Sequence, residues 1–143
     1  MLKIAMIGAG DIGFTRRLLM DILAVEEFRD AQFRLMDIHE ENLSMVTNLC
    51  RKMIADNDLP ATITATLHQR EAIAGADYVF CTARVGGLEA FRHDIEIPLR
   101  YGVDQCVGDT LGPGGVFFAL RTIPVFAGHC KGHARAGAEC GWR

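Results

Sequence analysis

The stretch that decides the fold is residues 2–13, which read Leu-Lys-Ile-Ala-Met-Ile-Gly-Ala-Gly-Asp-Ile-Gly. Residues 2–7 form a nearly continuous apolar run, which is typical of a strand buried on both faces of a parallel sheet. Three glycines follow directly, at Gly8, Gly10 and Gly13. A strand that ends in closely spaced glycines predicts a tight turn into a helix.

The rest of the chain repeats this alternation of strand and helix. The first helix should bury one face, because apolar residues recur there every three or four positions, at Phe14, Leu18, Leu19, Ile22 and Leu23. Further strands are predicted at residues 33–36, 61–66 and 76–82, and further helices at residues 40–54, 88–101 and 114–120. The last of these strands contains an apolar run, residues 78–81, that we expect to be buried. Such alternation predicts an α/β fold, a doubly wound parallel sheet with right-handed crossovers. We treat residues 1–127 as one Rossmann-like domain.

Composition narrows the class of protein. The chain has 143 residues, half of them hydrophobic, with a formal net charge of -3. This composition excludes bulk disorder and gives no attraction to nucleic acid or to an anionic membrane surface. No apolar window is long enough to span a bilayer, and the five cysteines are an odd number at irregular spacing. We expect a cytoplasmic protein with reduced thiols.

The glycines have the Gly-x-Gly-x-x-Gly spacing of a dinucleotide site. Gly8 would make the tight turn, Gly10 would let a pyrophosphate approach the backbone, and Gly13 would allow close helix packing. Asp37 ends the second predicted strand, where a carboxylate accepts hydrogen bonds from the adenosine ribose and repels a 2′-phosphate. The pattern therefore predicts NAD in preference to NADP. The alternative is a structural turn with an ordinary aspartate at a strand end.

Two later loops carry polar groups that are weaker candidates. Arg84 follows the fourth predicted strand, where doubly wound sheets bind their ligands, but it is equally consistent with a solvated loop arginine. Asp109 begins a glycine-rich loop, residues 109–115, that suits either a sugar or a plain turn. The remaining histidines and cysteines, including His129, Cys130, His133 and Cys140, match no common zinc pattern, so we predict no metal site.

Several segments together resemble the amino-terminal domain of family 4 glycoside hydrolases, in the branch of α-galactosidases and α-glucosidases. The resemblance covers about residues 2–126. The segments that carry it are Ile7-Gly8-Ala9-Gly10 with Phe14, Leu35-Met36-Asp37-Ile38, residues 75–79, Arg84-Val85-Gly86-Gly87, residues 108–115 and Arg121-Thr122-Ile123-Pro124.

This resemblance implies an NAD-dependent glycosidase that oxidises the sugar at carbon 3, eliminates the aglycone and returns the hydride. It implies NAD contacts from Gly8, Gly10, Gly13, Phe14 and Asp37, with Arg84 at the edge shared by cofactor and substrate and Asp109 beside the sugar. The substrate would be a small α-glycoside. The family also uses manganese, whose ligands, like the catalytic tyrosine, belong to segments that this chain lacks. The chain alone is therefore expected to be inactive.

The family resemblance stops before the last residues. Residues 128–143 are rich in Gly, Ala, Cys and His, so we predict an irregular tail, and we put forward the hypothesis that it is translated out of frame. The apolar side chains Phe117, Leu120 and Val125 would then lack cover, which favours a homo-oligomer. Two alternative functions remain, a malate/lactate-type dehydrogenase fragment and a stand-alone NAD-sensing module.

Overall fold

The computed structural model describes residues 1–105 and 111–135, with the backbone alone over 129–135. Four strands are present: β1 (Lys3–Ile7), β2 (Gln32–Met36), β3 (Thr62–Thr66) and β4 (Tyr78–Cys81). The helices are α1 (Ile12–Ala24), the 3-10 helix η1 (Glu26–Phe28), α2 (Glu40–Asp56), α3 (Gln69–Ile73), α4 (Gly87–Arg100) and α5 (Pro113–Arg135). Of the described residues, 1–83 and 129–135 form one compact unit, and those between 84 and 128 form a second. The sequence had suggested one domain over residues 1–127.

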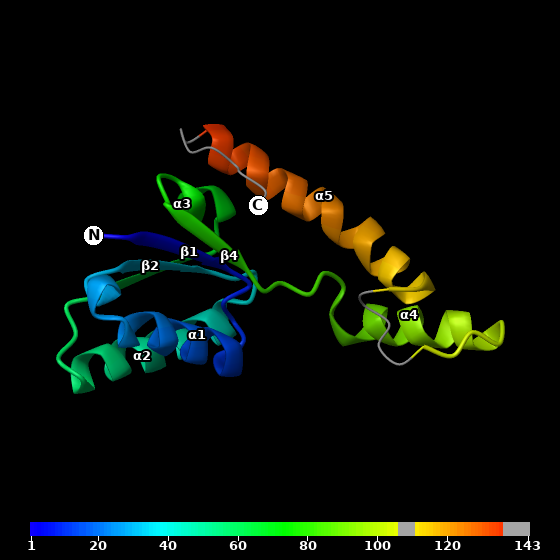
Figure 1. The fold of residues 1–143 in the computed structure, drawn as a ribbon, viewed down its shortest axis with the longest axis horizontal. Coiled ribbons are helices and arrows are strands. Elements are labelled where there is room, and N and C mark those ends of the chain that lie inside the picture. Colours follow the sequence, from blue (N-terminus) through cyan, green and yellow to red (C-terminus); the bar gives the residue numbers. More distant parts are fainter. Residues whose placement is uncertain (106–110, 136–143) are drawn as a thin grey trace. The chain divides into compact units, whose positions relative to one another are not determined.

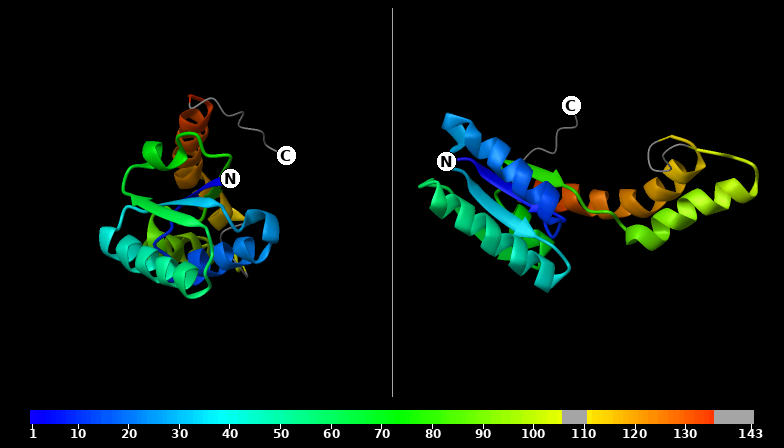
Figure 2. Two further views of the ribbon diagram at one scale, coloured as in Figure 1. Left: turned by 90° about the vertical axis from the view of Figure 1, so that its left-hand side faces the viewer. Right: turned by 90° about the horizontal axis from the view of Figure 1, so that it is seen from below.

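The first unit is a parallel sheet with strand order β3-β2-β1-β4. Helices α1 and α2 cover one face of the sheet, and α3 lies on the other, as Figures 1 and 2 show. In the register of the sheet, Ile7 lies opposite Met36 on one side and Cys81 on the other. The carboxyl ends of the three strands therefore meet at one edge. The predicted Rossmann-like α/β fold is confirmed.

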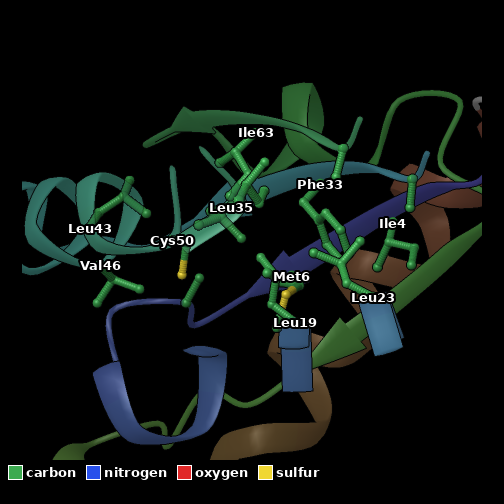
Figure 3. Packing of buried hydrophobic residues seen from close by; sticks show 14 residues of the cluster. Ile4, Met6, Leu19, Leu23, Phe33, Leu35, Leu43, Val46, Cys50 and Ile63 are labelled. Carbon is green, nitrogen blue, oxygen red and sulfur yellow. The ribbon is translucent and has the colours of Figure 1, made fainter. Parts of the chain in front are cut away.

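The main core fills the space between the sheet and helices α1 and α2 (Figure 3). Strands β2 and β1 are the two central strands of the sheet. The side chains of Phe33 and Leu35 project from β2 into this core and are fully buried. A smaller cluster on the opposite face joins Ala5 and Ile7 of β1 to Ile73 of α3. Strand β1 is thus buried on both faces, as its continuous apolar sequence predicted.

Helix α1 buries most of the expected stripe, because Leu19 and Leu23 are buried and Leu18 and Ile22 pack against the core, but the stripe begins at Thr15 and not at Phe14. Its fully buried residues are Thr15, Leu19 and Leu23, whereas Phe14 is 54% exposed. The carboxylate of Asp11 accepts a hydrogen bond from the Phe14 amide and so fixes where the helix begins. That start turns Thr15 toward the glycine turn and Phe14 outward. The prediction that Phe14 lies on the buried face was therefore wrong by one residue.

Two predictions about the later elements were also wrong. Residues 78–81 were expected to be a buried strand, but β4 is an edge strand with exposed side chains. An irregular tail was expected from residue 128, but α5 continues to Arg135. Once a helix exists each added residue gains a backbone hydrogen bond, and residues 128–135 contain no proline to stop it. Residues 136–143, which include Cys140, lie outside the described part of the chain.

Within the described residues, no helix is long and apolar enough to cross a membrane. The second unit consists of α4, the described residues between the helices, and most of α5. Leu120 and Val125 of α5 are exposed, as expected, whereas Phe117 is half-buried.

Candidate cofactor site

The glycine turn begins at Gly8, where the chain leaves β1 with a positive φ of 81°. A Cβ placed on Gly8 would lie only 2.6 Å from the backbone nitrogen of Ala83. This distance is too short for any side chain, and the obstacle is backbone, which cannot turn aside. Gly8 is therefore required both for the turn and for the close approach of the segment that follows β4.

The second glycine, Gly10, contacts Asp37, the residue predicted to bind the ribose. The backbone amide of Gly10 donates a 2.7 Å hydrogen bond to Oδ2 of Asp37, and the amide of His39 donates a 2.9 Å bond to Oδ1. A Cβ on Gly10 would lie 2.7 Å from the same Oδ2. Asp37 is buried, and its carboxylate is fixed in orientation by these two amides. The structure thus brings Gly10 and Asp37 together.

The third glycine does not have the role predicted for it. Among the described residues, a Cβ on Gly13 would meet only Oδ1 of Asp11, at 3.4 Å, which is an ordinary contact distance. The prediction of close helix packing at Gly13 was therefore wrong. Helix α1 packs through Thr15, Leu19 and Leu23, so Gly13 faces away from the sheet.

Sequence reasoning missed the residue that fastens α1 to the turn. The hydroxyl of Thr15 is completely buried and donates a 3.1 Å hydrogen bond to the carbonyl oxygen of Ala9. Ala9 is itself fully buried, and its amide donates to the carbonyl oxygen of Met36 at the end of β2. A hydroxyl-bearing residue two positions after the last glycine was the available signal, but a threonine inside a helix is common.

The end of β4 joins the same edge through a second threonine. The hydroxyl of Thr82 donates to the carbonyl oxygen of Gly8 at 3.0 Å, and its amide donates to that of Ile7 at 2.8 Å. The turn is therefore held on one side by β2 and on the other by the residues after β4. This arrangement leaves the first turn of α1 and Asp37 next to one another at the carboxyl edge of the sheet.

Arg84 begins the second unit, so its predicted place beside the cofactor stays a prediction. The Cζ atom of its guanidinium lies 4.6 Å from the centre of the Phe91 ring and 5.7 Å from the centre of the Phe118 ring. Both distances are within the range of a cation–π interaction. Arg84 is thus held by aromatic rings of α4 and α5.

An ion pair between the buried Asp94 and the partly exposed Arg121 fixes the residues next to Arg84. Asp94 of α4 is 1% exposed and accepts two hydrogen bonds from the Arg121 guanidinium, at 2.8 and 2.5 Å. Arg121 also donates through Nε to the carbonyl oxygen of Val85. Gly86 has a φ of 86°, and a Cβ there would lie 2.5 Å from the Cβ of Ala90. The hydrogen bonds to Asp94 raise the pKa of Arg121 above its ordinary value, so this cation stays charged.

Asp109 lies outside the described residues, so nothing in the structure places it. The loop is described on either side of it. The side chain of Gln105 donates to the carbonyl oxygen of Asp94 at 2.8 Å and accepts from the amide of Gly114 at 3.2 Å. The start of α5 is therefore attached to the same buried cluster as the ion pair.

Cys50 and Cys81, the two cysteines of the first unit whose side chains the structure describes, offer no ready nucleophile. Burial raises the pKa of the Cys50 thiol. Desolvation of the sulfur also raises the pKa of Cys81, and a hydrogen bond with the Ala83 backbone opposes this rise only in part. Both thiols stay protonated at neutral pH, and only the thiolate is reactive. In the part of the chain that the structure describes, no three His, Cys, Asp or Glu side chains gather to hold a metal ion.

Comparison with known proteins identifies the family. The family model described as "Family 4 glycosyl hydrolase" matches residues 3–133. This chain belongs to family 4 of the glycosyl hydrolases. It is similar to an α-galactosidase of Rhizobium meliloti, with 52% identity over 129 residues, which are 90% of this chain and 26% of the relative. An α-glucosidase of Erwinia rhapontici is 34% identical over 90% of this chain and 28% of its own length.

Solved structures agree. A 6-phospho-β-glucosidase from Thermotoga maritima, solved with manganese, NAD⁺ and glucose-6-phosphate, superposes with a TM-score of 0.82 at 28% identity, covering 94% of this chain and 32% of that one. The family 4 chain described here thus spans about a quarter to a third of the length of these relatives. The predicted resemblance to family 4 is confirmed.

The contact between Gly8 and Ala83 predicts a large difference between two glycine substitutions. Gly75 also has a positive φ, 66°, but no atom of the described residues lies within 4 Å of its missing Cβ. Gly75→Ala should cost about 1–2 kcal/mol of unfolding free energy from backbone strain alone. Gly8→Ala should cost about 1–3 kcal/mol more, because it adds overpacking against backbone. Urea denaturation followed by circular dichroism measures both, and equal losses would contradict the contact.

Proposed function

We propose that this chain binds NAD at the carboxyl edge of its sheet, through Gly8, Gly10, Gly13, Phe14 and Asp37. The observation that carries the proposal is the hydrogen bond between the Gly10 amide and the Asp37 carboxylate. It joins the two parts of the dinucleotide pattern, which are separate in the sequence, at the edge where doubly wound sheets bind ligands.

The residues present fit a dinucleotide. Each carboxylate oxygen of Asp37 accepts one backbone hydrogen bond and keeps a further lone pair, which suits the hydroxyl groups of a ribose. The missing side chain of Gly10 lets the carboxylate of Asp37 lie directly against the turn that would face the pyrophosphate. Phe14 is exposed beside this turn and offers an apolar surface. The negative charge of Asp37 favours NAD over NADP, whose 2′-phosphate it would repel.

The negatively charged carboxylate of Asp11 would repel the pyrophosphate of the cofactor. As the N-cap of α1, its carboxylate is the acceptor for the Phe14 amide at 2.7 Å. It therefore uses one of the amides that a pyrophosphate would otherwise accept from, and it partly cancels the positive end of the helix dipole. We infer that Asp11 stabilises the turn at some expense in affinity for NAD.

We propose that the whole protein of which this is the NAD-binding portion is a glycosidase. The 52% identical relative supports an α-galactoside or a similar small α-glycoside as substrate. NAD would supply the hydride acceptor for a transient oxidation at carbon 3 of the sugar. Arg84, held by Phe91 and Phe118, would face cofactor and substrate, and Asp109 would border the sugar. We also propose a cytoplasmic location and a homo-oligomer, which the exposed Leu120 and Val125 support.

Manganese is present in the solved Thermotoga maritima relative. The described residues of this chain provide no cluster that fits a metal ion, so we derive no metal step for it. A glycosidase of this type needs the sugar held against both the cofactor and a base, and the resemblance assigns those groups to other segments. We therefore propose that the isolated chain binds NAD without cleaving glycosides.

The role of Asp37 predicts that removing its charge lowers both the affinity for NAD and the preference for NAD over NADP. Asp37→Asn keeps an oxygen that can accept from Gly10 but removes the charge. NAD affinity should fall about 10- to 100-fold, the range expected for hydrogen bonds to a charged group, and the preference over NADP should narrow. Titration calorimetry with both cofactors measures this, with Asp21→Asn on the exposed face of α1 as the matched control. Unchanged NAD binding would refute the site.

The position of Asp11 predicts that removing its charge increases the affinity for NAD. Asp11→Ser keeps an oxygen that can cap α1 but removes the negative charge from the pyrophosphate side. NAD affinity should rise about 2- to 5-fold at low salt, and the gain should shrink at high salt. Calorimetry at two ionic strengths tests this against Asp21→Ser, which removes the same charge further along the helix. A loss of affinity in Asp11→Ser alone would show that the carboxylate contributes to binding.

The inactivity of the isolated chain is tested with a nitrophenyl α-galactoside, NAD and manganese. No nitrophenol release above background is expected from the purified 143-residue protein, whereas the complete Rhizobium meliloti α-galactosidase serves as the positive control. Manganese-dependent release by the isolated chain would show that its own residues complete the catalytic centre.

A further inference from the structure

The first turn of α2 lies beside the glycine turn. A Cβ on Gly10 would meet Oδ2 of Asp37 at 2.7 Å and the Cβ of Asn42 at 3.3 Å. Asp37 and Asn42 therefore lie on the same side of Gly10. Asn42 is the third residue of α2, and it is exposed. An uncharged polar side chain is thus placed next to both parts of the dinucleotide pattern.

The carboxylate of Asp37 sets this position of Asn42. Its Oδ2 accepts from the amide of Gly10, and its Oδ1 accepts from the amide of His39. His39 is the N-cap of α2, and its carbonyl oxygen accepts a 3.0 Å hydrogen bond from the amide of Leu43. One carboxylate therefore fixes both the glycine turn and the start of α2.

The surroundings of Gly10 are rich in negative charge. With histidine neutral, the charged side chains of residues 8–15 and 37–44 are all carboxylates, from Asp11, Asp37, Glu40 and Glu41. Such groups repel a pyrophosphate. The amide group of Asn42 is neutral and carries two N–H donors. Within residues 1–105 and 111–135 it has no hydrogen-bond partner, so both donors are available to a ligand.

We propose that the side-chain amide of Asn42 donates a hydrogen bond to the phosphate of NAD that carries the adenosine. This inference rests on the proposed NAD site. With the adenosine ribose on Asp37 and the pyrophosphate at Gly10, the phosphate that joins them lies between these two residues. Asn42 borders the same point. An ionised phosphate oxygen is also a stronger acceptor than a ribose hydroxyl, which favours the phosphate as the partner.

The alternative is that Asn42 faces only water. Asparagine is common near helix ends for reasons of local backbone hydrogen bonding, without any ligand. A solvated residue and a phosphate ligand respond differently to charge. A charge placed at residue 42 changes the affinity for NAD only if the side chain lies near the pyrophosphate, and its sign then decides the direction of the change.

The test uses titration calorimetry of NAD with the full 143-residue chain at two ionic strengths. Asn42→Asp keeps the shape of the side chain but replaces its donors by a negative charge, and Asn42→Lys supplies a positive charge. The matched controls are Asn48→Asp and Asn48→Lys, which make the same changes at an exposed residue six positions further along α2. Urea denaturation followed by circular dichroism reports whether each variant is folded.

At low salt, the affinity for NAD should fall about tenfold or more in Asn42→Asp and rise about 2- to 5-fold in Asn42→Lys. Both changes should shrink at high salt, and the Asn48 variants should bind NAD like the unchanged chain.

Unchanged affinity in both Asn42 variants, or equal losses in the two, would overturn the inference. A loss in Asn42→Asp that does not depend on salt would also overturn it, since it would assign the amide to a neutral ribose hydroxyl. Absence of NAD binding by the unchanged chain would instead refute the proposed function and this inference with it, so the two failures are distinguishable.

Discussion

The absence of a side chain at Gly8 lets the end of β1 lie directly against the backbone of Ala83, and the arrangement of the first unit depends on this contact. Since β1 is bordered by β2 and β4, its end is the point where the ends of three strands meet. Gly10 then turns toward Asp37 on the β2 side, while Thr82 holds Gly8 on the β4 side. A Cβ at either glycine would separate the groups that make the proposed cofactor site.

The second unit has its own organising interaction, the ion pair of Asp94 and Arg121. Removing the Arg121 guanidinium would leave the buried carboxylate of Asp94 without its two hydrogen-bond donors, which destabilises the packing of α4 against α5. The pair also extends to the carbonyl oxygen of Val85, next to Arg84. The residues after β4 are therefore fixed by the packing of α4 and α5, and a change in either helix would alter the position of Arg84 relative to its aromatic neighbours.

Much of the fold and of the candidate site could be predicted from the sequence, and the wrong predictions share a cause. The apolar run of residues 2–7, the glycine spacing and Asp37 are local patterns, and they led to the correct fold and family. The buried face of α1 was right except at its first residue, where Thr15 is buried in place of Phe14, because that residue depends on where Asp11 caps the helix. The role of Gly13 was wrong because packing at a glycine depends on the path of the neighbouring chain. Thr15 and the Asp94–Arg121 pair were missed because their partners are distant in the sequence or are backbone atoms.

The sequence by itself determined the alternation of strands and helices, the tight turn after β1 and the acidic residue at the end of β2, since each follows from residue type and spacing. Only the tertiary structure decided that Gly10 and Asp37 touch, that Arg84 lies over Phe91 and Phe118, and that β4 is an exposed edge. Residue type fixes which backbone conformations and which surfaces are favourable locally. Which of those surfaces meet depends on how distant strands and helices pack, because burial and hydrogen bonding are satisfied only by the neighbours that the fold supplies.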